Sequence, residues 1–314
     1  MPRLLPALFA CLLAAPAAAE APKVVADIAP VHALVSRVME GVGSPDLLLT
    51  PGQSPHTASM RPSQARALQE AGLVVWIGPE LTPWLAKPLE TLAGGAAQID
   101  LLEAQGTKVL GYRDPGEEEH EEHDDHEGHD DHEGHDDDHH EHSGTDPHAW
   151  LDTANAAVWL DVIASELAAL DPANAAAYRA NAAAGADEIA TLTAELETLL
   201  AGAGAHPVAT FHDGFQYFEA RFGIVSAGTL TLGDASSPSP ARVAHLRAVL
   251  AERGVACVFT EPQFDDRLIR AASEGTQARI ATLDPLGARL EPGAALYPQL
   301  LRAMAESVAA CLAP

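Results

Sequence analysis

Short apolar runs recur in both halves of the chain, and each is followed by turn residues and then by apolar positions at helical spacing. The runs cover residues 24–28, 47–50 and 74–77 in the first half, and 208–211, 224–227, 256–260 and 280–283 in the second. Strands that alternate with helices predict parallel sheets. Because the strands fall into two groups, the sequence predicts two α/β lobes.

A long helical segment separates the two groups of strands. Asp171 and Pro172 are a start signal, an N-cap followed by proline at the first helical position. Beyond them the chain is rich in alanine, with Ile189 and Leu192 on one face. We expect one rigid helix of about 30 residues, some 45 Å long, between the lobes. The predicted organisation is a leader at 1–19, a first lobe at 20–170, the helix at 171–203 and a second lobe at 204–314.

The first nineteen residues have the composition of an export signal. Arg3 supplies a positive start, residues 4–15 are mostly apolar, and Ala17 and Ala19 fit an A-x-A cleavage site. A membrane anchor is the alternative, but a span needs about 20 apolar residues and this run is shorter and contains proline. We therefore expect a signal peptide and a mature chain from about Glu20, exported to the periplasm.

The mature chain keeps two of the three cysteines, Cys257 and Cys311. An isolated pair in an exported protein indicates one disulfide, and two buried free thiols are the alternative. The formal net charge is −27, and fifteen of the 45 carboxylates lie in residues 117–141 without any Lys or Arg. The other 30 face 18 basic residues, which leaves −12. Nucleic acid is therefore not expected as a partner.

The acidic segment belongs to a tract of His, Asp, Glu and Gly at residues 114–146, which must protrude from the first lobe as a loop. Neutral imidazole is the commonest side-chain ligand for metals such as Zn²⁺, so the composition predicts weak metal sites. A solvated acidic loop with incidental histidines is the alternative. Nine of the fifteen histidines lie here: His120, His123, His126, His129, His132, His135, His139, His140 and His142.

Five further polar residues follow strand-like runs or close the tract: His56, His148, His212, Glu261 and Asp284. In open parallel sheets, ligands bind beyond the carboxyl ends of the strands, so these groups could meet in one crevice. Three imidazoles and one carboxylate make a set suited to Zn²⁺. Glu261 could instead hydrogen-bond a ligand imidazole. Ordinary surface or core positions are expected for the remaining histidines, His32, His206 and His245.

Five motifs stand in a characteristic order along the chain: GQSPHTASMRPSQ, TDPHAWLD, FHDGFQYF, FTEPQF and TLDPLG. With the His-rich tract just before the second motif, the mature chain resembles the periplasmic zinc-binding proteins of bacterial ABC importers, the ZnuA type. This resemblance implies two α/β lobes joined by one rigid helix, with the metal in the cleft between them.

The resemblance also implies roles for single residues. His56, His148 and His212 match the ligand histidines, and Asp284 matches the carboxylate that completes the site in many relatives. Manganese-type relatives typically have Glu at the third position, so His212 favours zinc. Glu261 is better assigned to support of a ligand than to the metal.

Four further positions bear on the resemblance. Some zinc receptors carry an acidic residue before the first ligand histidine, and Pro55 stands there in this chain. Ala58 replaces an aromatic residue that often follows. The pair Cys257 and Cys311 matches a disulfide of the zinc branch.

The leading hypothesis is a monomeric receptor that captures Zn(II) outside the inner membrane and delivers it to an ABC permease. A zinc hydrolase with Glu261 as general base is one alternative. The chain lacks an H-E-x-x-H motif, and Asp284 as a fourth ligand would occupy the coordination position that a catalytic water needs. A periplasmic zinc buffer or chaperone that never docks on a permease is the other alternative.

Overall fold

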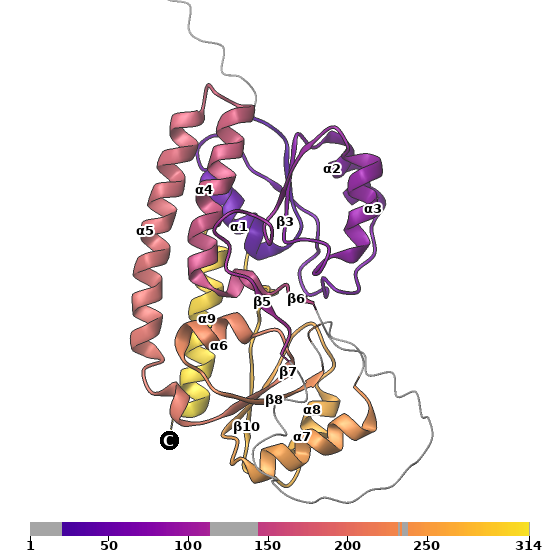
Figure 1. Ribbon diagram of the computed structural model, residues 1–314, viewed down its shortest axis with the longest axis vertical. Helices are drawn as coiled ribbons and strands as arrows, with labels where there is room; N and C mark the ends of the chain where they lie inside the picture. Colours follow the sequence, from indigo (N-terminus) through magenta and orange to yellow (C-terminus); the bar gives the residue numbers. More distant parts are fainter. Residues whose placement is uncertain (1–20, 114–143, 232, 234–237, 314) are drawn as a thin grey trace, which may run out of the picture.

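The computed structural model describes residues 21–113, 144–231, 233 and 238–313. Within these ranges the chain forms two α/β lobes, one above the other in Figure 1, with two long helices along one side. Both sheets are parallel, which confirms the predicted fold class. The predicted leader and most of the acidic tract, with its nine histidines, lie outside the described residues.

A four-stranded sheet in the order β2-β1-β3-β4 forms the centre of the first lobe. The central strands are apolar on both faces, as Val24 and Val25 of β1 illustrate, and are therefore covered on both sides by helices. The elements are β1 (Val24–Ala26), α1 (Ala29–Val38), β2 (Asp46–Leu47), α2 (Pro62–Glu70), β3 (Leu73–Trp76), α3 (Pro83–Leu92) and β4 (Ala97–Asp100).

The second lobe repeats this plan with a sheet in the order β10-β9-β7-β8. Its elements are β7 (Val208–His212), α6 (Gln216–Phe222), β8 (Ser226–Thr231), α7 (Pro240–Glu252), β9 (Cys257–Thr260), α8 (Arg267–Ser273), β10 (Arg279–Thr282) and α9 (Leu296–Leu312). A two-stranded antiparallel hairpin, β5 (Leu110–Gly111) and β6 (Thr145–Asp146), lies between the lobes (Figure 1).

The lobes are connected by two packed helices, α4 (Thr153–Leu170) and α5 (Ala175–Leu199). The long helix begins at Ala175 and not at Asp171 as predicted, because Asp171 ends α4. The Asp171 carboxylate accepts hydrogen bonds from the Asn174 amide and the Tyr178 hydroxyl, which fixes the turn between the helices. By length and hydropathy α4 could cross a membrane, but half of it is buried against the protein core.

Cys257 at the start of β9 and Cys311 near the end of α9 form a disulfide. The predicted pairing is thereby confirmed, and free thiols are excluded. The bridge closes a loop with a sequence separation of 54 residues. In the chain-entropy account, closing a loop of this size stabilises the folded state by about 4 kcal/mol.

Asp27 is a fully buried carboxylate directly after β1. It accepts hydrogen bonds from the backbone N–H groups of Ile28 at 2.7 Å and Ile77 at 2.9 Å. Burial raises the pKa of Asp27 from 3.8 to about 7, although the two hydrogen bonds lower it. The folded protein therefore binds this proton more tightly than the unfolded chain does.

Because the folded-state pKa of Asp27 is the higher one, its contribution to stability is complete below about pH 4 and is lost as the pH rises to about 7. Through this carboxyl the free energy of unfolding should fall by on the order of a few kcal/mol over this interval, and Asp27→Asn should remove this part of the slope. Urea unfolding across the interval measures it, with Asp46→Asn as the exposed control. An unchanged slope in Asp27→Asn would contradict the assignment.

Candidate metal centre

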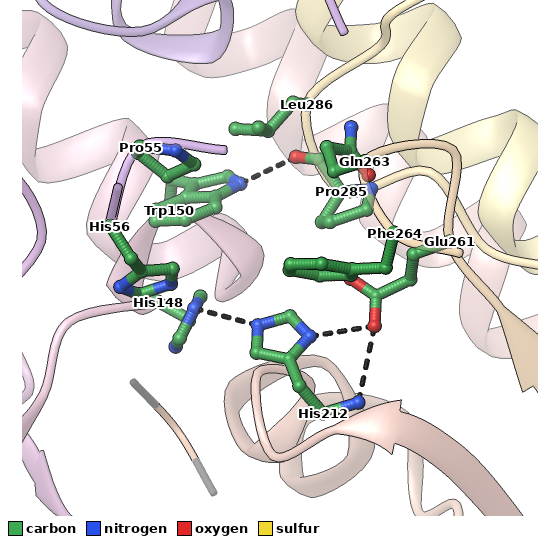
Figure 2. A pocket seen from close by; sticks show the side chains of 10 residues that line it. All are labelled: Pro55, His56, His148, Trp150, His212, Glu261, Gln263, Phe264, Pro285 and Leu286. Atoms are coloured by element: carbon green, nitrogen blue, oxygen red, sulfur yellow. Dashed lines mark hydrogen bonds and ion pairs between the residues drawn. The ribbon is translucent and has the colours of Figure 1, made fainter. Parts of the chain in front are cut away.

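Three of the predicted site residues meet between the lobes: His56, His148 and His212 (Figure 2). One potential ligand nitrogen from each lies within 4.8 Å of the other two. His212 ends β7, and His148 follows β6 after one residue, Pro147. His56 comes from the segment between β2 and α2, which is held where the Trp84 indole donates a hydrogen bond to the Pro55 carbonyl at 2.8 Å.

Two of these imidazoles are buried and are oriented by carboxylates. His148 Nδ1 lies 2.7 Å from Asp146 Oδ1, and His212 Nδ1 lies 2.6 Å from Glu261 Oε1. A carboxylate accepts a hydrogen bond from Nδ1–H, which leaves the lone pair of each ring on Nε2. The two Nε2 atoms lie only 3.2 Å apart. Two lone pairs at this distance repel each other unless a proton or a metal ion lies between them.

The two buried imidazoles differ in the direction of their pKa shifts. Burial lowers the pKa of His148 well below 6.5, and the neighbouring His212 lowers it further. Burial also disfavours charge on His212, but the charge and hydrogen bond of Glu261 outweigh it and raise the pKa of His212. His148 is therefore neutral at neutral pH, whereas His212 retains a proton more readily.

The two predicted carboxylates lie in different surroundings. Glu261 Oε1 contacts both the backbone N–H and the ring of His212, while its Oε2 is buried without a partner among the described residues. Asp284 accepts hydrogen bonds from Gln263 and from the backbone of its own turn. Neither carboxylate belongs to the group formed by the three histidines. The fourth ligand stays a prediction.

A small cavity of about 10 Å³, partly open to solvent, adjoins the histidines (Figure 2). Its walls are mostly apolar, with Trp150 from the first lobe and Phe264 from the second. The Trp150 indole donates a hydrogen bond to the Pro285 carbonyl at 2.8 Å, which joins the lobes beside the site. Low polarity around a metal strengthens its attraction to charged and polar ligands.

The hairpin of β5 and β6 is bonded to α6 of the second lobe. The Tyr217 hydroxyl donates to the Asp146 carbonyl at 2.9 Å and accepts from the Leu110 N–H at 2.8 Å, so one side chain holds both strands. Gln216 donates to the Gly111 carbonyl and to the Asp146 carboxylate. Asp146 stands two residues before His148, so the TDPH motif could have identified it. Tyr217 and Gln216 carry no comparable local signal.

The acidic tract leaves and re-enters the described structure at this hairpin. The Tyr112 N–H donates to the Gly144 carbonyl at 3.0 Å, so the two ends lie side by side. The Arg113 guanidinium forms ion pairs with Asp213 and with Glu219, at 2.9 Å for the latter. The predicted attachment of the tract beside the metal centre is therefore found in the described residues, although residues 114–143 are outside them.

The family model of the periplasmic component A of the zinc-uptake complex, ZnuA, matches residues 24–311. The high-affinity zinc uptake system protein ZnuA of Paracoccus denitrificans is 46% identical to this chain, over 95% of the chain and 94% of the relative. The protein of the same name from Brucella abortus is 40% identical, over 94% of this chain and 93% of its own length.

Solved structures agree with this match. A crystal structure of ZnuA has 25% identity and a TM-score of 0.74, and the alignment covers 92% of this chain and 98% of that one. The periplasmic zinc-binding protein TroA of Treponema pallidum shares the fold, with 20% identity, a TM-score of 0.77, and coverage of 94% and 100%. The chain belongs to the ZnuA family of periplasmic zinc-binding components, which serve an ABC importer and are not enzymes.

Proposed function

We propose that this protein captures one Zn²⁺ tightly through the Nε2 atoms of His56, His148 and His212. The observation that carries this proposal is the 3.2 Å separation of the His148 and His212 Nε2 atoms, in rings whose Nδ1 atoms are paired with carboxylates. Imidazole nitrogen binds zinc at about 2.0 to 2.1 Å, so an ion between the rings would replace a repulsive contact by two bonds. The family's role in zinc uptake supports the same metal.

Asp284 is the proposed fourth ligand. It is a carboxylate in the turn after β10, and the next two residues of that turn, Pro285 and Leu286, line the cavity beside the histidines. A carboxylate oxygen would complete a tetrahedral set with three imidazoles. To bind zinc, the Asp284 carboxylate must first give up hydrogen bonds that it accepts from the backbone of its own turn. In this assignment Glu261 orients the His212 ring, and zinc is bound by the three histidines and Asp284.

We further propose that the His-rich tract holds additional zinc weakly and passes it to the histidine site. Both ends of the tract lie at the hairpin, and His148 comes two residues after its second strand, so transfer covers a short path. A solved ZnuA deletion mutant with zinc bound, 25% identical to this chain with a TM-score of 0.76, is consistent with a tight site that needs only part of the chain.

Deletion of residues 117–142 should remove several weak zinc equivalents and leave one tight equivalent. The reason is that the tract contains no apolar residues that could contribute to a core. Titration calorimetry of the intact and shortened proteins measures both classes of site. Loss of the tight equivalent in the shortened protein would disprove that the tight site lies outside the tract.

We propose that the leader at residues 1–19 directs export. The mature protein then acts as a monomer and docks transiently on the importer's permease. A zinc buffer that never docks remains the second candidate, favoured by the metal-binding composition of the tract. Pull-down of the purified permease by the zinc-loaded protein separates the two. The hydrolase hypothesis is discarded, because the family consists of binding components.

A further inference from the structure

Helix α6 starts directly beside two of the three histidines. β7 ends at His212, and α6 begins at Gln216. The buried ring of Phe215, the residue before α6, lies edge-on to the His212 ring with 5.8 Å between the centroids. The turn itself passes so close that a Cβ on Gly214 would lie 2.2 Å from His212 Nε2 and 3.0 Å from His148 Nε2. The start of α6 is therefore packed against both rings.

The first turn of α6 also holds the chain just before His148. The Tyr217 hydroxyl donates to the Asp146 carbonyl, and the Gln216 amide donates to the Asp146 carboxylate. The same carboxylate accepts a hydrogen bond from the His148 N–H at 3.0 Å and lies 2.7 Å from the Nδ1 atom of that ring. α6 thus reaches His148 through the residue that orients its imidazole.

The last turn of α6 holds the chain just after His148. Arg221 Nε donates to Asp152 Oδ1 at 2.7 Å, and Arg221 Nη2 lies 2.5 Å from the same oxygen. The Asp152 side chain is 1% exposed, and its Oδ1 also accepts from the Ala154 N–H, which caps α4. Its Oδ2 has no hydrogen-bond partner among the described residues, and Lys108 Nζ is 3.9 Å away. Arg221 is the closer of these two cations to the buried carboxylate.

These contacts make α6 a link between two of the proposed ligands. The helix has seven residues and is about 10 Å long. Its two ends hold the chain on either side of His148, so this segment cannot turn about a single fixed point. Two nitrogens that bind one zinc tetrahedrally at about 2.0 to 2.1 Å lie about 3.3 Å apart. The observed separation of the His148 and His212 Nε2 atoms, 3.2 Å, is close to that value.

We propose that Arg221 is a positioning residue for the zinc site: through Asp152 it fixes the segment after His148 on α6, so that His148 and His212 keep the separation at which one ion bonds to both. This inference rests on the proposed three-histidine site. The segment of His56 is held from the first lobe. α6 therefore carries two ligands as one unit, to which the first lobe adds the third.

The test compares zinc affinity with stability in Arg221 variants of the full mature chain. Arg221→Met should lower the affinity about 10-fold, the lower end of the range for groups that support a metal ligand. Arg221→Lys should recover most of this loss, because lysine keeps the charge. Competition with a chelator strong enough to empty the weak sites of the tract measures the affinity. The absorption spectrum of the Co²⁺-loaded proteins, which reports ligand geometry, should change in Arg221→Met.

A second variant separates positioning from stability. Arg221→Met leaves the charge of Asp152 buried beside a more distant cation, so this variant should unfold at a lower urea concentration. Adding Asp152→Asn removes that charge and keeps a residue that can cap α4. The double variant should therefore regain stability, while its zinc affinity stays low and its Co²⁺ spectrum stays altered. If Arg221→Met alone does not fold, the double variant carries the test.

Two controls make each failure distinct. Arg270→Met breaks an exposed ion pair with Asp266 on α8 and should leave the affinity unchanged. His212→Ala should abolish tight binding, and if it does not, the proposed function itself fails. The inference about Arg221 is overturned, and the histidine site stands, if His212→Ala abolishes binding while Arg221→Met leaves affinity and spectrum unchanged. The same holds if affinity returns together with stability in the double variant.

Discussion

His212→Ala is expected to weaken zinc binding by more than about 100-fold, since removal of a group that merely supports a metal ligand already costs about 10- to 100-fold. His212 contributes an Nε2 atom 3.2 Å from that of His148, and its ring is fixed by Glu261. Without it, His148 and His56 offer two nitrogen ligands only. Competition with a chromogenic zinc chelator measures the change.

The matched control is His245→Ala, which removes a histidine from the exposed part of α7. It should leave the affinity within about twofold, because surface substitutions away from a site usually have small effects. The measurement is best made on the protein lacking residues 117–142, so that weak sites do not obscure the result. Equal losses in the two variants would remove His212 from the metal centre.

Glu261→Gln should lower zinc affinity at neutral pH by about 10-fold and make it less sensitive to acid. In the unaltered protein Glu261 raises the pKa of His212, so protons compete with zinc at this ring more strongly than they would without that charge. Glutamine keeps a hydrogen-bond acceptor for Nδ1 but removes the charge. The pKa of His212 then falls, and the loss of zinc shifts to lower pH.

Chelator competition between pH 5.5 and pH 8 follows this shift, with Glu252→Gln at the exposed end of α7 as the control. The coordination number of zinc, measured by X-ray absorption, should stay the same, because Glu261 is assigned to His212 and not to the metal. A midpoint that does not move, or a lost oxygen ligand, would contradict this role of Glu261.

The fold followed from sequence wherever apolar runs were continuous. β4 was missed because its sequence, Ala97 to Asp100, alternates apolar and polar residues and has one β-branched side chain. The start of α5 was placed at Asp171 because Asp-Pro is a good local start signal. That aspartate serves the preceding turn, where its partners are Asn174 and Tyr178. A local signal cannot tell which of two adjacent helices it belongs to.

The metal centre was predictable only in part, because local sequence signals mark some of its residues and not others. His56 follows β2 and His212 ends β7, so each lies at the carboxyl end of a strand, where open parallel sheets bind ligands. The two strands belong to different sheets, so the meeting of these histidines depends on how the lobes face each other. Tyr217 and Gln216 act through partners distant in the chain, and neither residue type marks a metal site by itself. Their roles become visible only when the hairpin and α6 are brought into contact.

The contacts that build the centre are distant in sequence, and this affects when it can form. His148 and His212 are 64 residues apart, the Trp150–Pro285 bond spans 135 residues, and the Tyr217–Leu110 bond spans 107. Contacts of such high sequence separation close late, because the entropy of long loops is lost before the contacts stabilise them. A newly exported chain therefore completes both lobes before its three histidines converge, so the ability to hold zinc tightly marks the end of folding.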